Sequence, residues 1–207
     1  MRSMKKMGSL VGLAVAIVAL TGASTASAVQ ITPAGTAFTA SSTGEHSFSI
    51  TSSIKVRCNQ AKFTGTTTNP ASASVSITAT YGTATGVSGA WCRLYVGGVF
   101  SNATVTPTSA WDLTTTTYAS GTSNGHVTTT TTTHVTVGTC TIDVPNQVVA
   151  VMGTNDDPSG LSAGITIDAS QAGMSYTSSG CSAFGIPASG STASYLGSVY
   201  ASNIWVM

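Results

Sequence analysis

Three residues in the middle of the chain have the types and the spacing of a recognition surface. Trp91, Arg93 and Tyr95 occupy every second position of residues 91–96, and alternate side chains of a β-strand point to opposite faces. If Cys92 faces the interior, these three side chains line the outer face, with a cation between two aromatic rings. Such a strip stacks a sugar ring or anchors a partner protein. The competing interpretation is an arginine–aromatic stack that only packs under a loop or a second layer.

Catalytic chemistry has weaker candidates. Two stretches match the G-x-S-x-G pattern of a nucleophile elbow, centred on Ser123 and Ser162. That chemistry requires a strand-to-helix turn, followed along the chain by an acidic residue and then a histidine. All three histidines precede Ser162, and no acidic residue separates Ser123 from the histidines after it. We therefore predict that the protein is not an enzyme, with a hydrolase of unrecognised type as an alternative.

Metal chemistry is also weakly supported. His126 and His134 are eight residues apart, and on one continuous strand they stand about 26 Å apart, too far to share an ion. Asn155, Asp156 and Asp157 place three oxygen-bearing side chains in one segment, which Ca²⁺ could use. The same residue types favour a turn, which is the preferred interpretation. The sequence predicts no cofactor.

The cysteines predict a disulfide framework. Cys58, Cys92, Cys140 and Cys181 make an even number of cysteines, which in an exported chain indicates two disulfides. A zinc site usually contains a close C-x₂₋₄-C pair, whereas the nearest two cysteines here are 34 residues apart. Of the three possible pairings, we favour Cys58–Cys92 with Cys140–Cys181, because each closes a loop of ~35–40 residues worth about 3–4 kcal/mol.

The N-terminal segment predicts export. Three basic residues among the first six precede an uncharged apolar run over residues 10–20, and Ala26-Ser27-Ala28 fits a signal-peptidase site. The apolar run is shorter than the ~20 residues of a membrane-spanning helix. We expect residues 1–28 to be a signal peptide, cleavage before Val29, no integral membrane span afterwards, and a secreted, extracellular protein.

Charge narrows the choice of partner. Residues 29–207 carry four basic and six acidic side chains, a formal net charge of −2. This balance disfavours electrostatic binding to nucleic acid or to an anionic membrane. So few ionisable groups also argue against general acid–base catalysis.

Alternation of apolar and polar residues recurs along the whole chain, whereas helical periodicity is absent. The clearest predicted strands are Ile54–Cys58, Ser74–Tyr81, Cys92–Val96 and Cys140–Val144. Further predicted strands cover residues 47–51, 99–106, 111–118, 126–137, 148–152, 165–168 and 194–207.

Turn residues separate these strands. Asn124-Gly125 is typical of a tight hairpin, and residues 174–190 are predicted to form a long loop that Cys181 holds to the sheet. Short strands at about 8–12-residue spacing indicate a sandwich or barrel. We predict a single all-β domain over residues 29–207, an antiparallel β-sandwich stapled by disulfides, with a small β-barrel as the alternative.

Several of these features together form a recognisable pattern. They are residues 31–43 (ITPAGTAFTASST), a strand ending in Cys58, the Cys92 strand, residues 138–145 (GTCTIDVP) and the late Cys181. Over most of residues 29–207 the pattern resembles a set of uncharacterised secreted, threonine-rich, four-cysteine β proteins of actinobacteria. The resemblance implies secretion, β structure and the disulfide pairing above. It implies no activity and no site residue.

The sequence thus predicts a secreted structural or binding protein of the cell envelope or the extracellular space, without enzymatic activity. The expected partner is a glycan or an envelope protein, bound through Trp91, Arg93 and Tyr95. A carbohydrate-binding module that uses exposed aromatic side chains is the first alternative, and the hydrolase is the second.

Overall fold

The computed structural model describes residues 28–156 and 164–207. Apart from Ala28, the predicted signal peptide lies outside the described residues, as do Asp157 and Ser162. Six long strands are each interrupted once and appear as pairs of consecutive shorter strands: β2 (Ala37–Ser42) and β3 (His46–Ser49), β4 (Ile54–Cys58) and β5 (Ala61–Thr66), β6 (Ser74–Tyr81) and β7 (Cys92–Val96), β8 (Val99–Pro107) and β9 (Trp111–Ala119), β10 (Thr122–Thr129) and β11 (Thr133–Val137), β12 (Cys140–Val144) and β13 (Val148–Asn155).

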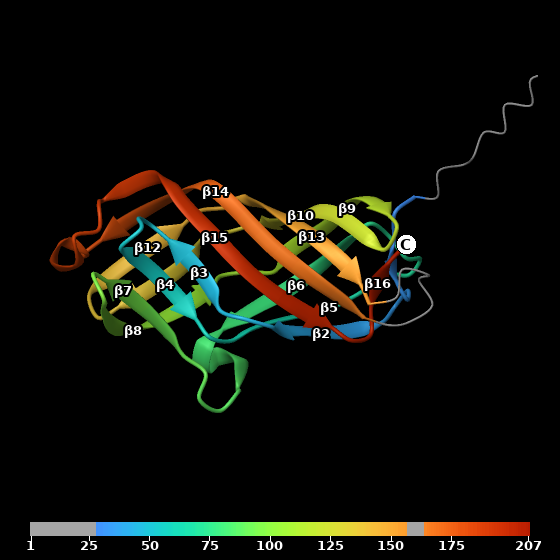
Figure 1. Cartoon of the computed structure of the whole chain (residues 1–207), viewed down its shortest axis with the longest axis horizontal. Coiled ribbons are helices and arrows are strands. Elements are labelled where there is room, and N and C mark those ends of the chain that lie inside the picture. The colour runs from blue at the N-terminus through green and yellow to red at the C-terminus, as the bar shows by residue number, and fades with distance from the viewer. Residues whose placement is uncertain (1–27, 157–163) are drawn as a thin grey trace, which may run out of the picture.

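Two further strands, β14 (Ile165–Ser179) and β15 (Ser189–Ala201), run the length of the molecule side by side (Figure 1). Two short strands, β1 (Ile31–Thr32) and β16 (Trp205–Val206), pair with each other near the C-terminus. Two 3₁₀ turns, η1 (Gly82–Thr85) and η2 (Ser182–Phe184), lie in the connections.

The hydrogen-bonded strand order closes on itself, so the long strands form one antiparallel up-and-down barrel. One half of its length contains β2, β5, β6, β9, β10 and β13, and we call it the terminal half. The other contains β3, β4, β7, β8, β11 and β12, and we call it the disulfide half. β14 and β15 belong to both halves. The predicted all-β, disulfide-stapled fold is confirmed, and of the two architectures considered the closed strand order is that of the barrel.

Strict alternation along each strand explains this architecture. In β6, Val75 and Ile77 are buried, whereas Ser76 and Thr78 between them are exposed. Because the sheet closes, the apolar face of every strand points to a shared interior and the Ser/Thr face points to solvent. Two clusters of buried apolar side chains fill the interior, one lying mainly in each half.

Two predicted segments differ from the structure. The predicted continuous strand over residues 126–137 is wrong, because the chain leaves the sheet at residues 130–132 and β10 and β11 bond to different neighbours. The predicted loop over residues 174–190 is too long, because β14 continues to Ser179. Its small polar residues suit the outer face of a strand as well as a loop, which is why composition misled the prediction.

The predicted hairpin at Asn124-Gly125 is also wrong. The β9–β10 turn lies at Ser120 and Gly121, which both have positive φ. Asn124 and Gly125 instead lie inside β10, at a bulge in its pairing with β9. A Cβ on Gly125 would stand 2.1 Å from the carbonyl oxygen of Thr114. Glycine therefore serves a close backbone approach at this position.

Two disulfides join the chain as predicted. Cys58 bonds to Cys92 across the neighbouring strands β4 and β7, and Cys140 of β12 bonds to Cys181 just after β14. All four cysteines are buried. In the described part of the chain, no helix has the length and apolar character needed to cross a membrane.

Removing either disulfide is expected to destabilise the barrel. Replacing Cys58 and Cys92 together by alanine should lower the free energy of unfolding by about 2–5 kcal/mol, because the unfolded chain regains the entropy of a closed loop. Urea unfolding of this variant and of the matched Cys140/Cys181 variant measures the effect. The two loops are of similar length, 34 and 41 residues, so similar losses are expected, and losses below about 1 kcal/mol would contradict the account.

Candidate functional site

The outer face of the disulfide half carries the predicted recognition residues. Trp91, Arg93 and Tyr95 are half-buried and belong to neither buried core cluster. Cys92 and Leu94, which alternate with them, are 4% and 1% exposed. The predicted assignment of the two faces is therefore confirmed, and the three side chains lie on the outside of the sheet.

The register of the sheet brings cations from a second strand to this strip. Antiparallel pairing of β4 with β7 sets Arg57 opposite Arg93 and Lys55 opposite Tyr95. On the other side, β8 sets Phe100 opposite Tyr95. We name this surface the cation–aromatic face, and it consists of Lys55, Arg57, Trp91, Arg93, Tyr95 and Phe100.

The rings and guanidinium groups of this face form a continuous stack. The guanidinium carbon of Arg93 lies 4.4 Å from the ring centroid of Trp91 and 4.2 Å from that of Phe100. The Phe100 ring lies 5.8 Å from that of Tyr95, which in turn lies 5.2 Å from the guanidinium carbon of Arg57. These separations fall within the range of cation–π and aromatic contacts. Each guanidinium is thereby held against an aromatic ring.

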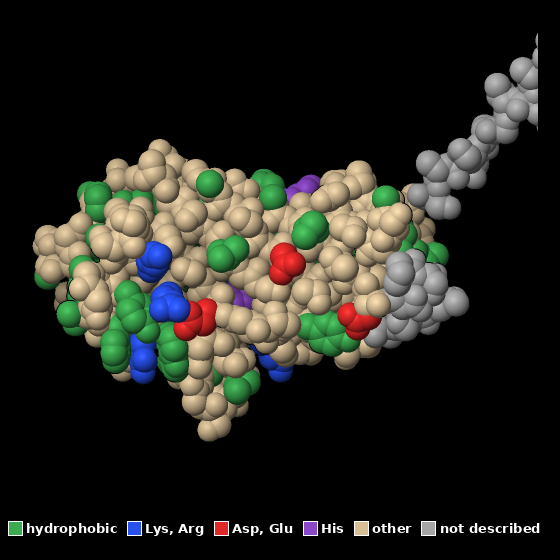
Figure 2. Space-filling model, viewed as in Figure 1, with side chains coloured by type: hydrophobic (Ala, Val, Ile, Leu, Met, Phe, Trp, Pro, Cys, Tyr) green, Lys and Arg blue, Asp and Glu red, His purple; other side chains and the backbone are tan. Residues whose placement is uncertain are grey.

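Charge is concentrated on the cation–aromatic face. Three of the four Lys and Arg residues of residues 29–207 belong to it, and the fourth is Lys62 of β5. Figure 2 shows basic side chains gathered with hydrophobic ones over β4, β7 and β8. Glu45 pairs with Arg57, so the face together with Glu45 carries a formal charge of +2, while the rest of residues 29–207 carries −4. The face therefore attracts anions although the protein as a whole does not.

The facing positions of Arg57 and Arg93 are electrostatically unfavourable when no anion is bound. Like charges at facing positions of an antiparallel pair repel, and Glu45 neutralises only Arg57. Among the described residues Arg93 has no carboxylate partner, and its Nε is buried without a hydrogen-bond acceptor. An oxyanion at this position would accept hydrogen bonds from both guanidinium groups and remove the repulsion.

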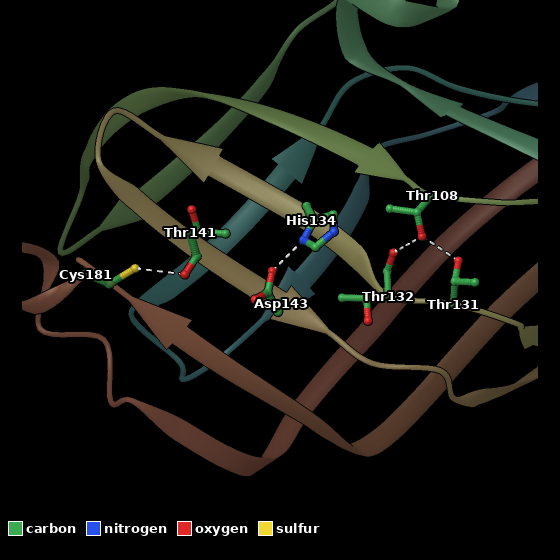
Figure 3. A network of polar contacts seen from close by, with 7 residues as sticks. All are labelled: Thr108, Thr131, Thr132, His134, Thr141, Asp143 and Cys181. Atoms are coloured by element: carbon green, nitrogen blue, oxygen red, sulfur yellow. Dashed lines mark hydrogen bonds and ion pairs between the residues drawn. The ribbon is translucent and has the colours of Figure 1, made fainter.

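A second group of polar side chains crosses β12, β11 and β8. The Nδ1 atom of His134 lies 2.6 Å from Oδ1 of Asp143, and Thr106 is the facing residue of His134 on its other side. Figure 3 shows the His134–Asp143 pair on neighbouring strands. Asp143, His134 and Thr106 thus provide a carboxylate, a base and a hydroxyl on three neighbouring strands. Thr106 lies within a strand, however, whereas the nucleophile of an elbow lies on a sharp turn before a helix. We assign no catalytic role to this row.

Two of the serine and calcium candidates, Ser123 and Asn155, form hydrogen bonds within the barrel. Ser123 is buried in β10, and its hydroxyl donates to the carbonyl oxygen of Gly153. The side-chain amide of Asn155 donates to the carbonyl of Val206 at 2.7 Å and accepts from its N–H at 3.1 Å. Asn155 therefore joins β13 to β16. Ser162 and Asp157 lie outside the described residues.

His126 and His134 lie on different strands, β10 and β11, and not on the single strand that was predicted. Over residues 28–156 and 164–207, no three side chains among His, Cys, Asp and Glu are grouped so that they could hold a metal ion.

A buried hydrogen-bond chain in the interior was not predicted. His46 Nε2 lies 3.2 Å from the carbonyl oxygen of Ser198, which can only accept, so Nε2 carries the proton. Its Nδ1 therefore accepts from the Tyr195 hydroxyl at 2.6 Å, and the Tyr81 hydroxyl lies 3.3 Å from that of Tyr195. Gly197 leaves room for the imidazole, because a Cβ there would stand 2.3 Å from Nδ1.

Burial sets the protonation of this chain. It lowers the pKa of His46 from 6.5 to about 4, although the bond to Ser198 acts in the opposite direction. Burial likewise raises the pKa of Tyr195 to about 12. All three side chains are therefore neutral near pH 7.

Comparisons with protein-family models, with curated proteins and with solved structures found no match. The site is therefore interpreted from its own geometry.

Sequence reasoning missed half of the cation–aromatic face. The strand Ile54–Cys58, which contains Lys55 and Arg57, was predicted but was not connected with the strand that carries Arg93. The favoured Cys58–Cys92 bond contained the missing signal. Taken as a cross-strand disulfide in an antiparallel pair, it sets residue 57 opposite 93 and residue 55 opposite 95.

The positions of two tryptophans predict different effects on stability. Trp91→Ala removes an outward ring and should change the free energy of unfolding by at most about 1 kcal/mol. Trp111→Ala empties an interior position that is 7% exposed and should cost about 3–5 kcal/mol. Urea unfolding of both variants tests this assignment. A larger loss for Trp91→Ala than for Trp111→Ala would show that the two faces had been inverted.

The depressed pKa of His46 predicts loss of stability in acid. The unfolded imidazole takes up a proton near pH 6.5, whereas the native one does so only near pH 4. The free energy of unfolding should therefore be unaffected by His46 above about pH 7 and fall by about 3 kcal/mol between pH 6.5 and 4. Urea unfolding from pH 8 to 4 measures this, with His46→Gln as the control, because an amide can both donate and accept. Parallel pH profiles for the wild type and this variant would contradict the assignment.

Proposed function

We propose that this protein is a binding protein of the cell envelope or extracellular space, without enzymatic activity, whose cation–aromatic face recognises an acidic polysaccharide. One observation carries the proposal: Arg57 and Arg93 face each other across β4 and β7, stacked on aromatic rings, and among the described residues only Arg57 has a carboxylate partner. Guanidinium groups fixed in this way are suited to bidentate binding of carboxylate, sulfate or phosphate.

The residues around the guanidinium groups favour a sugar polymer over other anions. Ser47 and Ser49 of β3 face Arg57 and Lys55, and Asn102 of β8 faces Arg93. These small polar side chains match the hydroxyl groups of a sugar, and the half-exposed ring of Phe100 offers a surface for its C–H face. With Ser47 and Ser49 of β3 included, this surface crosses only four strands. A protein partner usually covers about 800 Å², so such a narrow surface suits a linear polymer better.

An acidic ligand is favoured over a neutral one because the guanidinium groups already cover part of the ring faces. A neutral glycan would have only the uncovered part of these rings, chiefly Phe100, to stack on. Acidic sugar units instead supply negative charge to balance the two arginines, which have only the carboxylate of Glu45 between them.

Two features support export and a non-catalytic role. Two buried disulfides are typical of proteins that fold in an oxidising compartment. The outer surface of the strands is mostly Ser and Thr, which offer few groups for general acid–base catalysis.

Binding to polygalacturonate, a carboxylated polysaccharide, tests the proposal. Titration calorimetry at low ionic strength should show saturable binding that weakens with added salt, because the contacts are screened at the surface. Arg93→Gln and Arg57→Gln should each weaken binding at least tenfold, because each removes charge-assisted hydrogen bonds. Lys62→Gln is the matched control, since it removes the one cation of residues 29–207 that lies off the face, and it should change the affinity less than twofold.

Three outcomes would contradict the proposal. Equal binding of neutral dextran would exclude charge recognition. Tighter binding of poly-glutamate than of polygalacturonate would point to an acidic protein partner. Equal losses for Lys62→Gln and Arg93→Gln would show that only net charge matters and that the stacked geometry does not.

A further inference from the structure

The outer surface is hollowed beside the cation–aromatic face. The hollow has a volume of about 490 Å³ and is open to solvent. Residues 49–52, Lys55, Thr192 and Ser194 line it. We call it the hydroxyl hollow, because Ser and Thr supply most of its wall. Since one six-membered ring fits an enclosed cavity of about 150 Å³, the hollow has room for about two or three sugar rings.

The register of the sheet connects the hydroxyl hollow with the cation–aromatic face. Ser194 of β15 faces Ser49 of β3, and Ser49 faces Lys55 of β4. Lys55 in turn faces Tyr95 of β7, which faces Phe100 of β8. One row of outward side chains therefore crosses five neighbouring strands, and Lys55 belongs to both surfaces.

The wall of the hollow offers one unpaired cation and several unused hydroxyl groups. Over residues 28–156 and 164–207, Lys55 has no carboxylate partner, and the wall contains neither Asp nor Glu. In the same part of the chain, the side chains of Ser52, Thr192 and Ser194 form no hydrogen bond. These groups can therefore bind a carboxylate and sugar hydroxyls without first losing a partner in the protein.

The hollow lacks the features that a protein partner requires. Its one apolar wall residue, Ile50, is 2% exposed. Protein interfaces depend on aromatic or apolar anchors that fill a pocket on the other side. A wall of hydroxyl groups with a single cation matches a hydrated, acidic polymer instead.

We propose that the hydroxyl hollow binds the sugar units of the acidic polysaccharide that follow the unit held by Arg57 and Arg93, with Lys55 pairing with an acidic group between them. This inference rests on the proposed function and extends its ligand to a segment of several units. Arg93 shares a row with Leu196, three strands away, and Thr192 lies four residues further along β15. With strands ~4.8 Å apart and residues ~3.3 Å apart, the path from Arg93 to Thr192 is about 20 Å long.

Galacturonate oligomers of two lengths test this path. Digalacturonate can occupy the arginine pair, whereas tetragalacturonate also reaches the hollow. In ¹⁵N NMR titrations at ~0.1 M salt, the tetramer should bind at least tenfold more tightly than the dimer, as expected for one added charge-assisted hydrogen bond and beyond the statistical gain from its overlapping dimer units. Only the tetramer should perturb the amide signals of Ser52 and Thr192.

Two variants of the hollow and one matched control locate the effect. Thr192→Glu should weaken tetramer binding at least fivefold by charge repulsion and change dimer binding less than twofold, because the new carboxylate is about two Debye lengths from Arg93. Lys55→Gln should remove most of the tetramer's advantage over the dimer. Thr78→Glu adds the same charge at an exposed position of β6 in the terminal half, and it should change neither affinity more than twofold. The melting curve of each variant shows that it is folded.

The outcomes separate this inference from the proposed function. Equal affinities for dimer and tetramer, both weakened by Arg93→Gln, would overturn the hollow and leave the cation–aromatic face as the site. Equal losses of tetramer affinity for Thr192→Glu and Thr78→Glu would also overturn the hollow, because only net charge would then matter. Absence of binding of both oligomers to the wild type would overturn the proposed function and this inference together.

Discussion

The pairing of β14 with β15 along almost their whole length is the contact on which the rest of the barrel depends. Their paired residues extend from Ile165 and Ala201 at one end to Thr177 and Ser189 at the other. At the first end β14 pairs with β13 and β15 with β2, and further along they pair with β12 and β3. These two strands therefore close both halves, and the six interrupted strands need only follow one another as a meander.

Closure also fixes where chemistry can occur. Since every apolar face points inward, the interior can contain only neutral groups, and burial keeps the His46–Tyr195–Tyr81 chain uncharged. Charge is confined to the outer face. There it is concentrated where β4 and β7 set Arg57 opposite Arg93. The structure thus separates an apolar interior from a cationic external surface.

Much of this architecture could be predicted from the sequence, because period-2 alternation specifies strands and faces whatever their partners are. The segment Cys92–Val96 was assigned the correct inward and outward sides for this reason. Partner choice is a long-range property, so the sequence did not show that Arg57 joins the cation–aromatic face. The same limit applies to the predicted hairpin at Asn124-Gly125. The glycine there is required by the close approach of the Thr114 backbone on the neighbouring strand and not by a turn. The buried His46–Tyr195–Tyr81 chain depends on packing between distant strands and left no local signal.

We propose that recognition occurs on the outside of β4, β7 and β8. The most direct test is to follow backbone amide signals of the ¹⁵N-labelled protein during titration with a short galacturonate oligosaccharide. The account predicts that the perturbed signals gather along these three strands, with Arg93 and Phe100 among the largest. Perturbations centred on β14 and β15, or on the His134–Asp143 row, would place the binding site elsewhere and contradict the account.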